Sequence, residues 1–346
     1  CNLNMTPVLL GNTTIWKPPT TATLSNYYLM KMFEEAGLPA GVVNFVPSRG
    51  AEIGKICCES KHLAGIHFTG STGTFQSLWK SVGANIDKYV SYPRLVGETG
   101  GKDFIFAHKS APARELAVAI LRGAFEYQGQ KCSAASRAYV PASIWNETLN
   151  HIKEMMMTVK MGDVRDFSNF VNAVIDEKSF DNIAGYIDRA KASKDAEIAL
   201  GGHYDKSVGY FVEPTIIVAK TTDYESIREE IFGPVITVYV YEDDKYEETL
   251  RICDTTSPYA LTGSIFAQDR FAIEVAEQML RHSAGNFYIN DKPTGAVVGC
   301  QPFGGARASG TNDKAGSMLN LTRWVSARCI KETYVPATDY GYPFLK

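Results

Sequence analysis

The first hundred residues alternate between short apolar runs and segments in which apolar residues recur at helical spacing. Runs of β-type residues occupy positions 13–16, 42–46 and 64–68. Between the first two runs, residues 29–36 show the i, i+3, i+4, i+7 spacing of one helical face, and a glycine stops the helix directly afterwards. A second helix, at residues 52–59, connects the last two runs. This βαβαβ order predicts a parallel sheet.

The rest of the chain continues the alternation without an internal repeat or a low-complexity tract. A β-type run at 103–106 precedes a helix that Pro112 opens. Further elements with the same patterns are helices at 177–193 and 271–280 and strands at 234–241 and 263–267. Residues 324–325 and 330–335 are again β-type, and we expect a terminal strand there. No linker rich in Gly, Ser or Pro separates the two blocks, so we predict two adjoining α/β lobes.

The composition sets limits rather than a function. The chain has 346 residues, of which 45% are hydrophobic and 21% charged, as is typical of a globular protein with a substantial core. A net charge of −3 gives no reason to expect a nucleic-acid or anionic-membrane partner. No stretch approaches 18 uncharged apolar residues, so we expect no membrane span.

Cysteine and histidine usage narrows the chemistry. Seven cysteines, an odd number without a CxxC pair, favour reduced thiols in an intracellular compartment over a disulfide framework. The six histidines show no HxxxH spacing, so we expect no metal site. The chain starts at Cys1 without an initiator Met or a leader, and we interpret the sequence as N-terminally truncated.

A turn of small residues, Gly70-Ser71-Thr72-Gly73-Thr74, is the first candidate binding element. It follows a predicted strand and precedes a predicted helix. Backbone N–H groups at such a helix N-terminus can bind a phosphate. The turn lacks the GxGxxG spacing of dinucleotide-binding folds, so an ordinary strand-to-helix turn is the simpler interpretation when it is taken alone.

Two reactive side chains stand in glycine-containing segments. Glu98, which lies between Gly97 and Gly100, is suited to a general base that must reach a water, although a solvated turn is an equal alternative. Cys132 follows a glycine-containing turn and Lys131, and becomes a candidate nucleophile if a lowered pKa or a nearby base activates it. For a single cysteine, a buried structural thiol is the more frequent case.

Three later segments complete the candidates. Glu230 and Phe232 lie directly before a predicted strand. At such a position a carboxylate can bind a ribose, and an aromatic side chain can pack against a ring of a ligand. Phe303 lies in a loop and can line an apolar binding pocket. Gly295 and Ala296 precede it in the sequence, and a glycine in such a loop can leave backbone N–H donors free. Each segment taken singly is more simply an ordinary Gly/Pro turn.

Taken in order, these segments resemble the aldehyde dehydrogenase superfamily over essentially the whole chain. The matching motifs are Lys17 in Trp-Lys-Pro, Phe68 to Gly73, Glu98 in Glu-Thr-Gly-Gly-Lys, Cys132 in Gly-Gln-Lys-Cys, Glu230 to Pro234 and Pro302 to Gly305. The resemblance implies an α/β fold with a Rossmann-type parallel-sheet cofactor domain, an α/β catalytic domain and a C-terminal oligomerisation strand. The implied domains are residues 1–100, the carboxyl-terminal part of the NAD-binding domain, residues 101–310, the catalytic domain, and residues 311–346, the C-terminal segment with its oligomerisation arm.

Within the superfamily, the chain most resembles the Δ1-pyrroline-5-carboxylate dehydrogenase family, which oxidises L-glutamate γ-semialdehyde to L-glutamate in proline catabolism. The resemblance lies in residues 131–134, 286–292, 294–296 and 303–314. It implies that Ser133 and the backbone N–H groups of Gly295 and Ala296 hold the α-carboxylate of the substrate. It also implies that Phe303 packs on the aliphatic part of the substrate.

The resemblance also implies a mechanism. Cys132 adds to the aldehyde carbon, its own backbone N–H stabilises the oxyanion, and Glu98 activates the water that hydrolyses the thioester. Lys17 and Glu230 would bind the two riboses of NAD, Ser71 a phosphate, and Phe232 would lie beside the nicotinamide. The second oxyanion donor of the family, an Asn, would lie upstream of this chain. Thr20 stands where many relatives carry a Glu, so NAD is expected and NADP is left open.

The resemblance implies a small-molecule aldehyde as substrate and a homodimer or larger oligomer, with the arm at residues 324–335. It places the protein in bacterial cytoplasm or, in a eukaryote, in the mitochondrial matrix. Three alternatives stay open: another carboxylated or aliphatic aldehyde as substrate, an acylating enzyme that passes the thioester to coenzyme A, and a non-catalytic dinucleotide-binding relative. The presence of Glu98 disfavours the second, and Cys132, Glu98 and Ser133 together disfavour the third.

Overall fold

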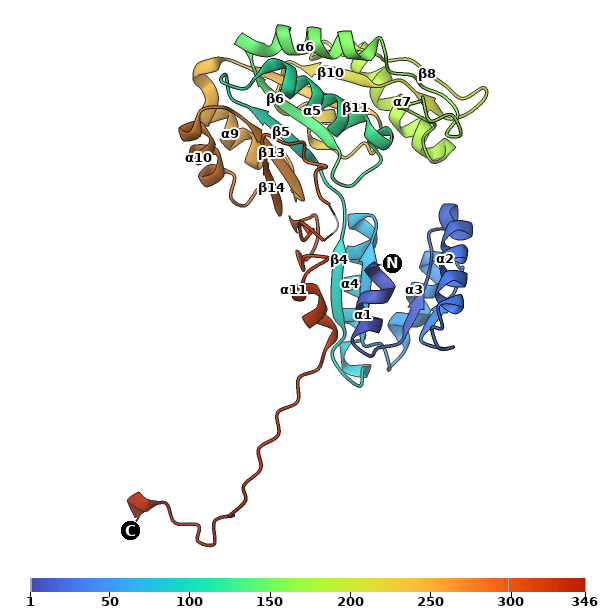
Figure 1. Cartoon of the computed structure of the whole chain (residues 1–346), viewed down its shortest axis with the longest axis vertical. Coiled ribbons are helices and arrows are strands. Elements are labelled where there is room, and N and C mark those ends of the chain that lie inside the picture. The colour runs from blue at the N-terminus through green and yellow to red at the C-terminus, as the bar shows by residue number, and fades with distance from the viewer. Residues whose placement is uncertain (1, 298, 346) are drawn as a thin grey trace.

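The computed structural model describes residues 2–297 and 299–345, and its elements form two lobes (Figure 1). The first lobe runs from α1 (Asn2–Leu9) to β4 (Arg94–Glu98), and the second begins with β5 (Asp103–Ala107). After the second lobe, the chain returns along β4 and ends in a tail that extends away from both lobes (Figure 1). The two lobes predicted from the sequence are therefore present, whereas the exact domain boundaries stay a prediction.

The first lobe contains the predicted strands and helices in the predicted order. Its other elements are β1 (Thr14–Trp16), α2 (Thr23–Glu35), β2 (Val43–Phe45), α3 (Gly50–Glu59), β3 (Gly65–Thr69) and α4 (Thr72–Ala84). The expected parallel pairing is confirmed, since β1 pairs with β2 and β3 with β4. The strands nevertheless form two separate pairs instead of one sheet, because no described strand bridges β1 and β3.

The second lobe is built on a seven-stranded sheet in the order β14-β13-β5-β6-β11-β10-β7, in which only β7 is antiparallel to its neighbour. Its strands after β5 are β6 (Ala135–Pro141), β7 (Ala196–Leu200), β10 (Thr215–Ala219), β11 (Val235–Tyr241), β13 (Thr262–Phe266) and β14 (Asn286–Ile289). Its helices are α5 (Ala113–Phe125), α6 (Ala142–Met156), α7 (Glu177–Ala192), α8 (Glu225–Arg228), α9 (Tyr246–Thr255) and α10 (Arg270–Met279). The helices and strands predicted here are confirmed within a few residues at each end.

Four short strands and one short helix complete the strands and α-helices of the described residues. They are β8 (Tyr204–Asp205), β9 (Phe211–Val212), β12 (Tyr259–Ala260), β15 (Ala306–Arg307) and α11 (Met318–Leu321). Each of the two additional strand pairs, β8 with β9 and β12 with β15, is antiparallel. The second of these pairs fixes the start of the C-terminal segment against the second lobe.

Helices cover both faces of the large sheet, and β5 shows how the sequence achieves this. Successive side chains of a strand point to opposite faces. Accordingly, Ile105 packs among residues of α5 and α6, whereas Phe104 and Phe106 pack among residues of α9 and α10. All three side chains are fully buried. A continuous apolar run, rather than an alternating one, is what a strand buried on both faces requires.

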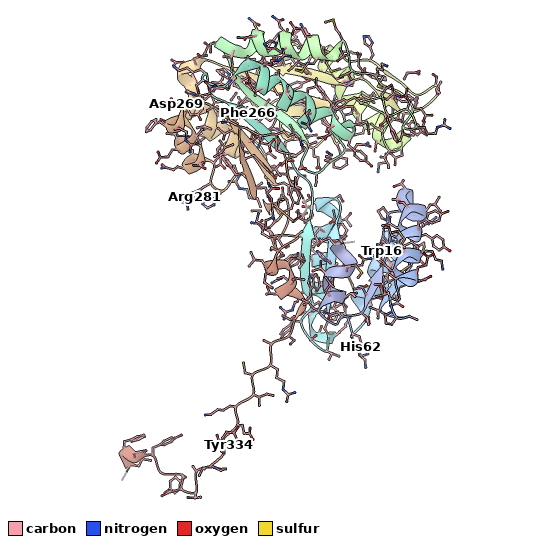
Figure 2. All side chains as sticks on the ribbon, in the orientation of Figure 1. Trp16, His62, Phe266, Asp269, Arg281 and Tyr334 are labelled. Carbon is pink, nitrogen blue, oxygen red and sulfur yellow. The ribbon has the colours of Figure 1, made fainter. Side chains whose placement is uncertain are left out.

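The first lobe encloses much less. None of the residues of α2 is buried, although Phe33 of this helix contacts Trp16 with ring centroids 6.3 Å apart. Figure 2 locates Trp16 in this lobe and the buried Phe266 in the other. The apolar face that the sequence predicts for α2 is therefore present, but it is only partly covered by described residues.

The predicted terminal strand is not formed within the described chain. Residues 325–342 carry no strand assignment, and Tyr334 lies far from both lobes (Figure 2). A strand exists only as a hydrogen-bonded partner of another strand. β-type residues such as Ile330 and Val335 are 78% and 85% exposed instead. Among residues 2–297 and 299–345, no helix has the length and hydropathy needed to cross a bilayer.

Candidate active site

The segment from Glu98 to Lys102 carries the chain from β4 of the first lobe to β5 of the second. A Cβ atom added to Gly101 would lie 2.5 Å from the carbonyl oxygen of Cys132. Only a glycine permits so close an approach of two backbones. The glycine pair that follows Glu98 in the sequence therefore places the Glu98 segment against Cys132.

An unusual turn positions Cys132. Helix α5 ends at Phe125, and Tyr127, Gln128 and Gly129 then adopt positive φ angles of 56°, 57° and 62°. A Cβ atom on Gly129 would lie 2.2 Å from the carbonyl oxygen of Gly233, so this turn packs directly on the loop that carries Glu230 and Phe232. Two consecutive non-glycine residues in the left-handed region are strained, and such strain concentrates at functional sites.

The Cys132 thiol is not activated by the lysine that precedes it. Burial raises the pKa of Cys132 to about 12, and the carboxylates of Asp103, Glu98 and Glu230 act in the same direction. Lys131 points its ammonium to Glu126, with 3.3 Å between Nζ and Oε2. The sequence offered two routes to a thiolate, a lowered pKa and a nearby base. Because the pKa is raised, a nearby base is the route that remains.

Glu98 is that candidate base. Burial raises its pKa to about 8, while the Gly305 N–H and the charge of Lys314 favour the ionised form and Asp313 disfavours it. Its Oε2 atom is buried without a hydrogen-bond partner among the described residues. A carboxyl group with a pKa near neutrality and one free oxygen is suited to accepting a proton.

The small-residue turn forms the exposed N-terminus of α4. Ser71 is the N-cap residue, and its Oγ accepts the Thr74 N–H at 3.3 Å. A Cβ atom on Gly73 would meet nothing within 4 Å, so space is open above this helix end. The Gly100 N–H donates to Thr72 Oγ1 at 3.4 Å, which joins the turn to the segment that follows Glu98. Exposed N–H groups at a helix N-terminus are suited to a phosphate.

Glu230 and Phe232 lie on the other side of the same segment. Glu230 accepts the Gly101 N–H with Oε1 at 2.9 Å, and Oε2 lies 2.6 Å from the position of a Cβ on Gly100. Phe232 has a positive φ of 60° and is 44% exposed. The Glu230 carboxylate thus lies near Cys132, and the same loop presents an exposed ring at Phe232, an arrangement that fits the ribose and the nicotinamide ring of a dinucleotide.

The predicted carboxylate-binding residues lie on two loops held together by ion pairs. Lys292 Nζ donates to Thr294 Oγ1 at 2.9 Å and lies 3.5 Å from Glu126 Oε2, which joins the Gly295 loop to the turn before Cys132. Of the two backbone donors expected to be free, the Gly295 N–H instead donates to the Lys292 carbonyl at 3.1 Å. That bond closes the turn 292–295.

The remaining predicted residues are placed with less definition. The backbone of Phe303 pairs antiparallel with Ala315, and Phe303 itself is half-buried. Lys17 directly follows β1 and is also half-buried. In the part of the chain that the structure describes, no hydrogen bond or ion pair joins Lys17 to another predicted site residue. The roles proposed for these two residues therefore rest on the resemblance.

Four charged residues near the site had no role from the sequence: Lys102, Asp103, Lys292 and Lys314. Lys102 and Asp103 are almost fully buried, so burial lowers the pKa of Lys102 and raises the pKa of Asp103. Asp103 Oδ1 accepts the Thr262 N–H at 2.6 Å. Two charged residues directly before the apolar run Phe104-Ile105-Phe106 were a sequence signal for such a buried cluster. Within the described ranges, no group of three or more His, Cys, Asp or Glu side chains could hold a metal ion.

Comparison with known proteins agrees with this geometry. Residues 2–328 match the aldehyde dehydrogenase family. This chain belongs to the aldehyde dehydrogenase family. The predicted fold class is thereby confirmed, including the α/β architecture with a predominantly parallel sheet.

Several relatives carry one name. The aldehyde dehydrogenase chain is 59% identical over 346 residues to the mitochondrial delta-1-pyrroline-5-carboxylate dehydrogenase of Dictyostelium discoideum and 49% identical to that of Homo sapiens. A crystal structure of the Mycobacterium tuberculosis delta-pyrroline-5-carboxylate dehydrogenase bound with NAD superimposes with a TM-score of 0.93 at 52% identity, and covers 99% of this chain and 63% of that one. The matches to the two curated relatives include at least 99% of this chain, which spans 62% of the length of each relative.

Proposed function

We propose that this chain carries the catalytic residues of an NAD-dependent aldehyde dehydrogenase that oxidises L-glutamate γ-semialdehyde, the open form of Δ1-pyrroline-5-carboxylate, to L-glutamate in proline catabolism. The observation that carries the proposal is the convergence on Gly100-Gly101, where the Cys132 carbonyl, the Glu230 carboxylate and the segment after Glu98 meet. The names of the relatives supply the substrate, and the NAD-bound structure supplies the cofactor.

In the proposed reaction, Cys132 is the nucleophile. Its thiol proton passes to Glu98, directly or through a water, and the thiolate sulfur forms a bond to the aldehyde carbon. The aldehyde oxygen becomes an oxyanion, for which the backbone N–H of Cys132 is a donor. Bound NAD would supply the acceptor for the hydride that leaves this carbon. Cys132 is then held as a thioester.

Glu98 also acts in the second half of the reaction. After its first proton has passed to solvent, the ionised carboxylate takes a proton from a water as the water oxygen attacks the thioester carbon. The carbon–sulfur bond breaks, Cys132 leaves as a thiolate, and the acid is released. Because burial raises the pKa of Glu98 to about 8, the ionised fraction and hence hydrolysis should increase as the pH rises through that value.

The residues present fit the cofactor. The exposed N-terminus of α4, with Gly70, Ser71 and the open space at Gly73, suits the pyrophosphate. Glu230 keeps Oε2 available for a ribose hydroxyl, and Phe232 offers an exposed ring for the nicotinamide. Lys17 is proposed for the second ribose. NAD is proposed over NADP, and a comparison of kcat/KM for the two cofactors tests that choice.

The α-carboxylate of the substrate is proposed to bind between Ser133 and the loop of Gly295 and Ala296. The Ser133 hydroxyl and the Ala296 N–H are the suitable donors, since the Gly295 N–H already donates to the Lys292 carbonyl. Phe303 is proposed to contact the methylene groups of the substrate. A hydroxyl and a backbone donor next to lysine side chains favour an anionic group.

A homodimer or larger oligomer is also proposed. The tail exposes Ile330, Tyr334, Val335 and Tyr340 at 78% to 95%, and such β-type residues would be buried if they added a strand to a neighbouring subunit. The compartment proposed is the mitochondrial matrix for a eukaryotic source, since the names of the Dictyostelium and human relatives state mitochondrial, and the cytoplasm for a bacterial one.

The test is a comparison of substrates in the full-length protein. We expect NAD reduction with L-glutamate γ-semialdehyde at a higher kcat/KM than with succinic semialdehyde or acetaldehyde. Cys132→Ala should lower turnover on the order of 10⁴-fold or more, whereas the exposed Cys300→Ala should leave it unchanged. A preference for one of the other aldehydes would remove the proposed substrate, and full turnover by Cys132→Ala would remove the proposed mechanism. Formation of an acyl-coenzyme A product would assign the acylating type instead.

A further inference from the structure

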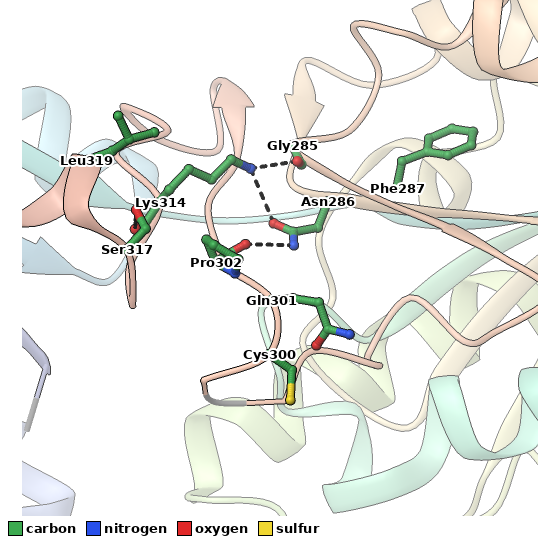
Figure 3. Close-up of a pocket in the computed structure, with 9 residues that line it drawn as sticks. All are labelled: Gly285, Asn286, Phe287, Cys300, Gln301, Pro302, Lys314, Ser317 and Leu319. Atoms are coloured by element: carbon green, nitrogen blue, oxygen red, sulfur yellow. Dashed lines mark hydrogen bonds between the residues drawn. The ribbon is translucent and has the colours of Figure 1, made fainter.

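Lys314 lies in the C-terminal segment, where the chain returns along the first lobe. Its Nζ donates to the carbonyl oxygens of Gly285 at 2.6 Å and Gly304 at 3.0 Å and lies 3.4 Å from Asn286 Oδ1. Figure 3 shows the side chain crossing toward Gly285 and Asn286 at the edge of a cavity of about 360 Å³. An ammonium with acceptors from three residues is held in one place.

These contacts fix the loop that touches Glu98. Asn286, the first residue of β14, donates to the Pro302 carbonyl at 2.9 Å (Figure 3). It also accepts the Gly304 N–H at 3.1 Å. Lys314 adds its bond to the Gly304 carbonyl, so loop 302–305 is clamped to the start of β14. The next residue, Gly305, donates its N–H to the Glu98 carboxylate.

The same loop brings Lys314 to Glu98 itself. A Cβ atom on Gly304 would lie 3.1 Å from Glu98 Oε1 and 3.2 Å from the backbone nitrogen of Lys314, so the carboxylate and the backbone of Lys314 flank one residue. Lys314 is the largest cationic influence on the pKa of Glu98, and Glu98 in turn is the charge that acts on the pKa of Lys314.

We propose that Lys314 is a positioning residue for the general base: it clamps the loop that donates to Glu98, and its charge increases the fraction of Glu98 that is ionised and able to promote hydrolysis of the thioester. The proposal rests on the proposed function of Glu98. It adds to that function a residue that acts through Glu98 and not on the substrate: Lys314 sets the pH range in which the thioester is hydrolysed.

Two other titratable groups act on Glu98 or respond to it, and one of them, Asp313, provides a control variant. Asp313, from the same segment, acts on Glu98 in the opposite direction. It pairs with Arg323 at 3.2 Å and accepts the Thr311 hydroxyl at 2.5 Å. From the loop before β6, Cys132 is the titratable group that senses Glu98. Removing the Lys314 charge should therefore raise the pKa of Glu98, and removing the Asp313 charge should lower it.

The experiment measures the pH dependence of steady-state turnover and the NADH burst of the first turnover in the full-length protein. For Lys314→Met, we expect the midpoint of steady-state turnover to move up by roughly one pH unit, at the lower end of the shift of about 1–3 units that a neighbouring opposite charge produces in a carboxyl pKa, because Lys314 and Glu98 influence each other without forming an ion pair within the described residues. Turnover at pH 7 should fall roughly tenfold for a one-unit shift. The burst amplitude should persist, because the acyl-enzyme accumulates when hydrolysis is slow.

Three variants separate charge from structure. Lys314→Arg keeps the positive charge and should bring the pH midpoint most of the way back to the wild-type value. Asp313→Asn should lower the midpoint. Lys220→Met should leave it unchanged, because Lys220 donates to the backbone carbonyl of Lys194 and has no contact with Glu98. If Lys314→Met aggregates, Lys314→Gln removes the charge and keeps a hydrogen-bonding group. An unchanged midpoint in the soluble neutral variant, at any level of activity, would overturn the proposal. Absence of semialdehyde oxidation by the wild type would instead overturn the proposed function.

Discussion

The two lobes carry different parts of the site because they bury their side chains differently. In the second lobe, nine residues of α5 are buried, and β5 is enclosed on both faces. In the first lobe, α2 buries none of its residues, and the strands form two-stranded pairs. A low-dielectric interior shifts the pKa of a titratable group, whereas an exposed helix end offers free N–H donors to a charged ligand.

The site follows this division. Cys132 and Asp103 belong to the second lobe, and burial raises the pKa of both. Ser71, at the exposed N-terminus of α4, belongs to the first lobe. Glu98 is the exception: it ends a strand of the first lobe, but the C-terminal segment covers it and burial raises its pKa. The group expected to move protons therefore ends a first-lobe strand but lies against the C-terminal segment.

The largest effect on stability should come from the core of the second lobe. Phe106 is fully buried and lies 5.4 Å from Tyr139 and 5.5 Å from Tyr241 between ring centroids. Phe106→Ala should lower the free energy of unfolding by about 3–5 kcal/mol, because it removes buried area and leaves a cavity. Urea denaturation followed by fluorescence measures the change. A loss below about 1 kcal/mol would mean that this core is not tightly packed.

A smaller effect is expected where the two loops of the carboxylate site meet. Lys292→Met removes the bonds to Thr294 and Glu126, so the Gly295 loop is no longer fastened to the turn before Cys132. We expect KM for L-glutamate γ-semialdehyde to rise roughly tenfold, which corresponds to about 1.4 kcal/mol, while KM for acetaldehyde stays nearly constant. An equal rise for both aldehydes would show that Lys292 supports the whole site and not the carboxylate loop.

The smallest effect is expected on the first lobe. Met32 of α2 is 61% exposed. Met32→Ala should change the free energy of unfolding by at most about 0.5 kcal/mol, since substitutions at exposed positions without specific contacts have little effect. The same denaturation assay provides the comparison with Phe106→Ala. A loss of several kcal/mol would mean that α2 is covered in the full-length protein, and the contrast between the lobes would then not hold.

The sequence predicted most elements of both lobes, because hydrophobic periodicity records which face of an element is buried. The strand-like run at 103–106, which is apolar from Phe104 onward, and the helix after Pro112 are clear cases, and both lie in the second lobe. The predicted terminal strand at 330–335 did not form, because strand formation depends on a partner that local sequence cannot specify. The separation of the first-lobe strands into the pairs β1-β2 and β3-β4 has the same cause, because no described strand pairs with both β1 and β3.

The chemistry was harder to predict than the fold. Cys132, Glu98 and Glu230 were found through motifs, and the structure brings them together at Gly100-Gly101. Lys314 was not assigned a role, because its importance comes from contacts with Gly285 and Gly304, which the sequence does not place beside it. The raised pKa of the Cys132 thiol was likewise invisible, since it depends on burial among carboxylates from separate segments.

The central claim is that Cys132 forms a thioester that Glu98 hydrolyses. Its most direct test is intact-protein and peptide mass spectrometry of the full-length Glu98→Gln variant over a time course of reaction with NAD and L-glutamate γ-semialdehyde. Because Glu98 also accepts the Cys132 thiol proton, the adduct should form more slowly than in the wild type. We predict that one γ-glutamyl group then persists on the peptide containing Cys132 after the wild-type adduct has been hydrolysed, and that no adduct forms in Glu98→Gln combined with Cys132→Ala. An unmodified Cys132 accompanied by full NADH production, or an adduct that persists without Cys132, would contradict the account.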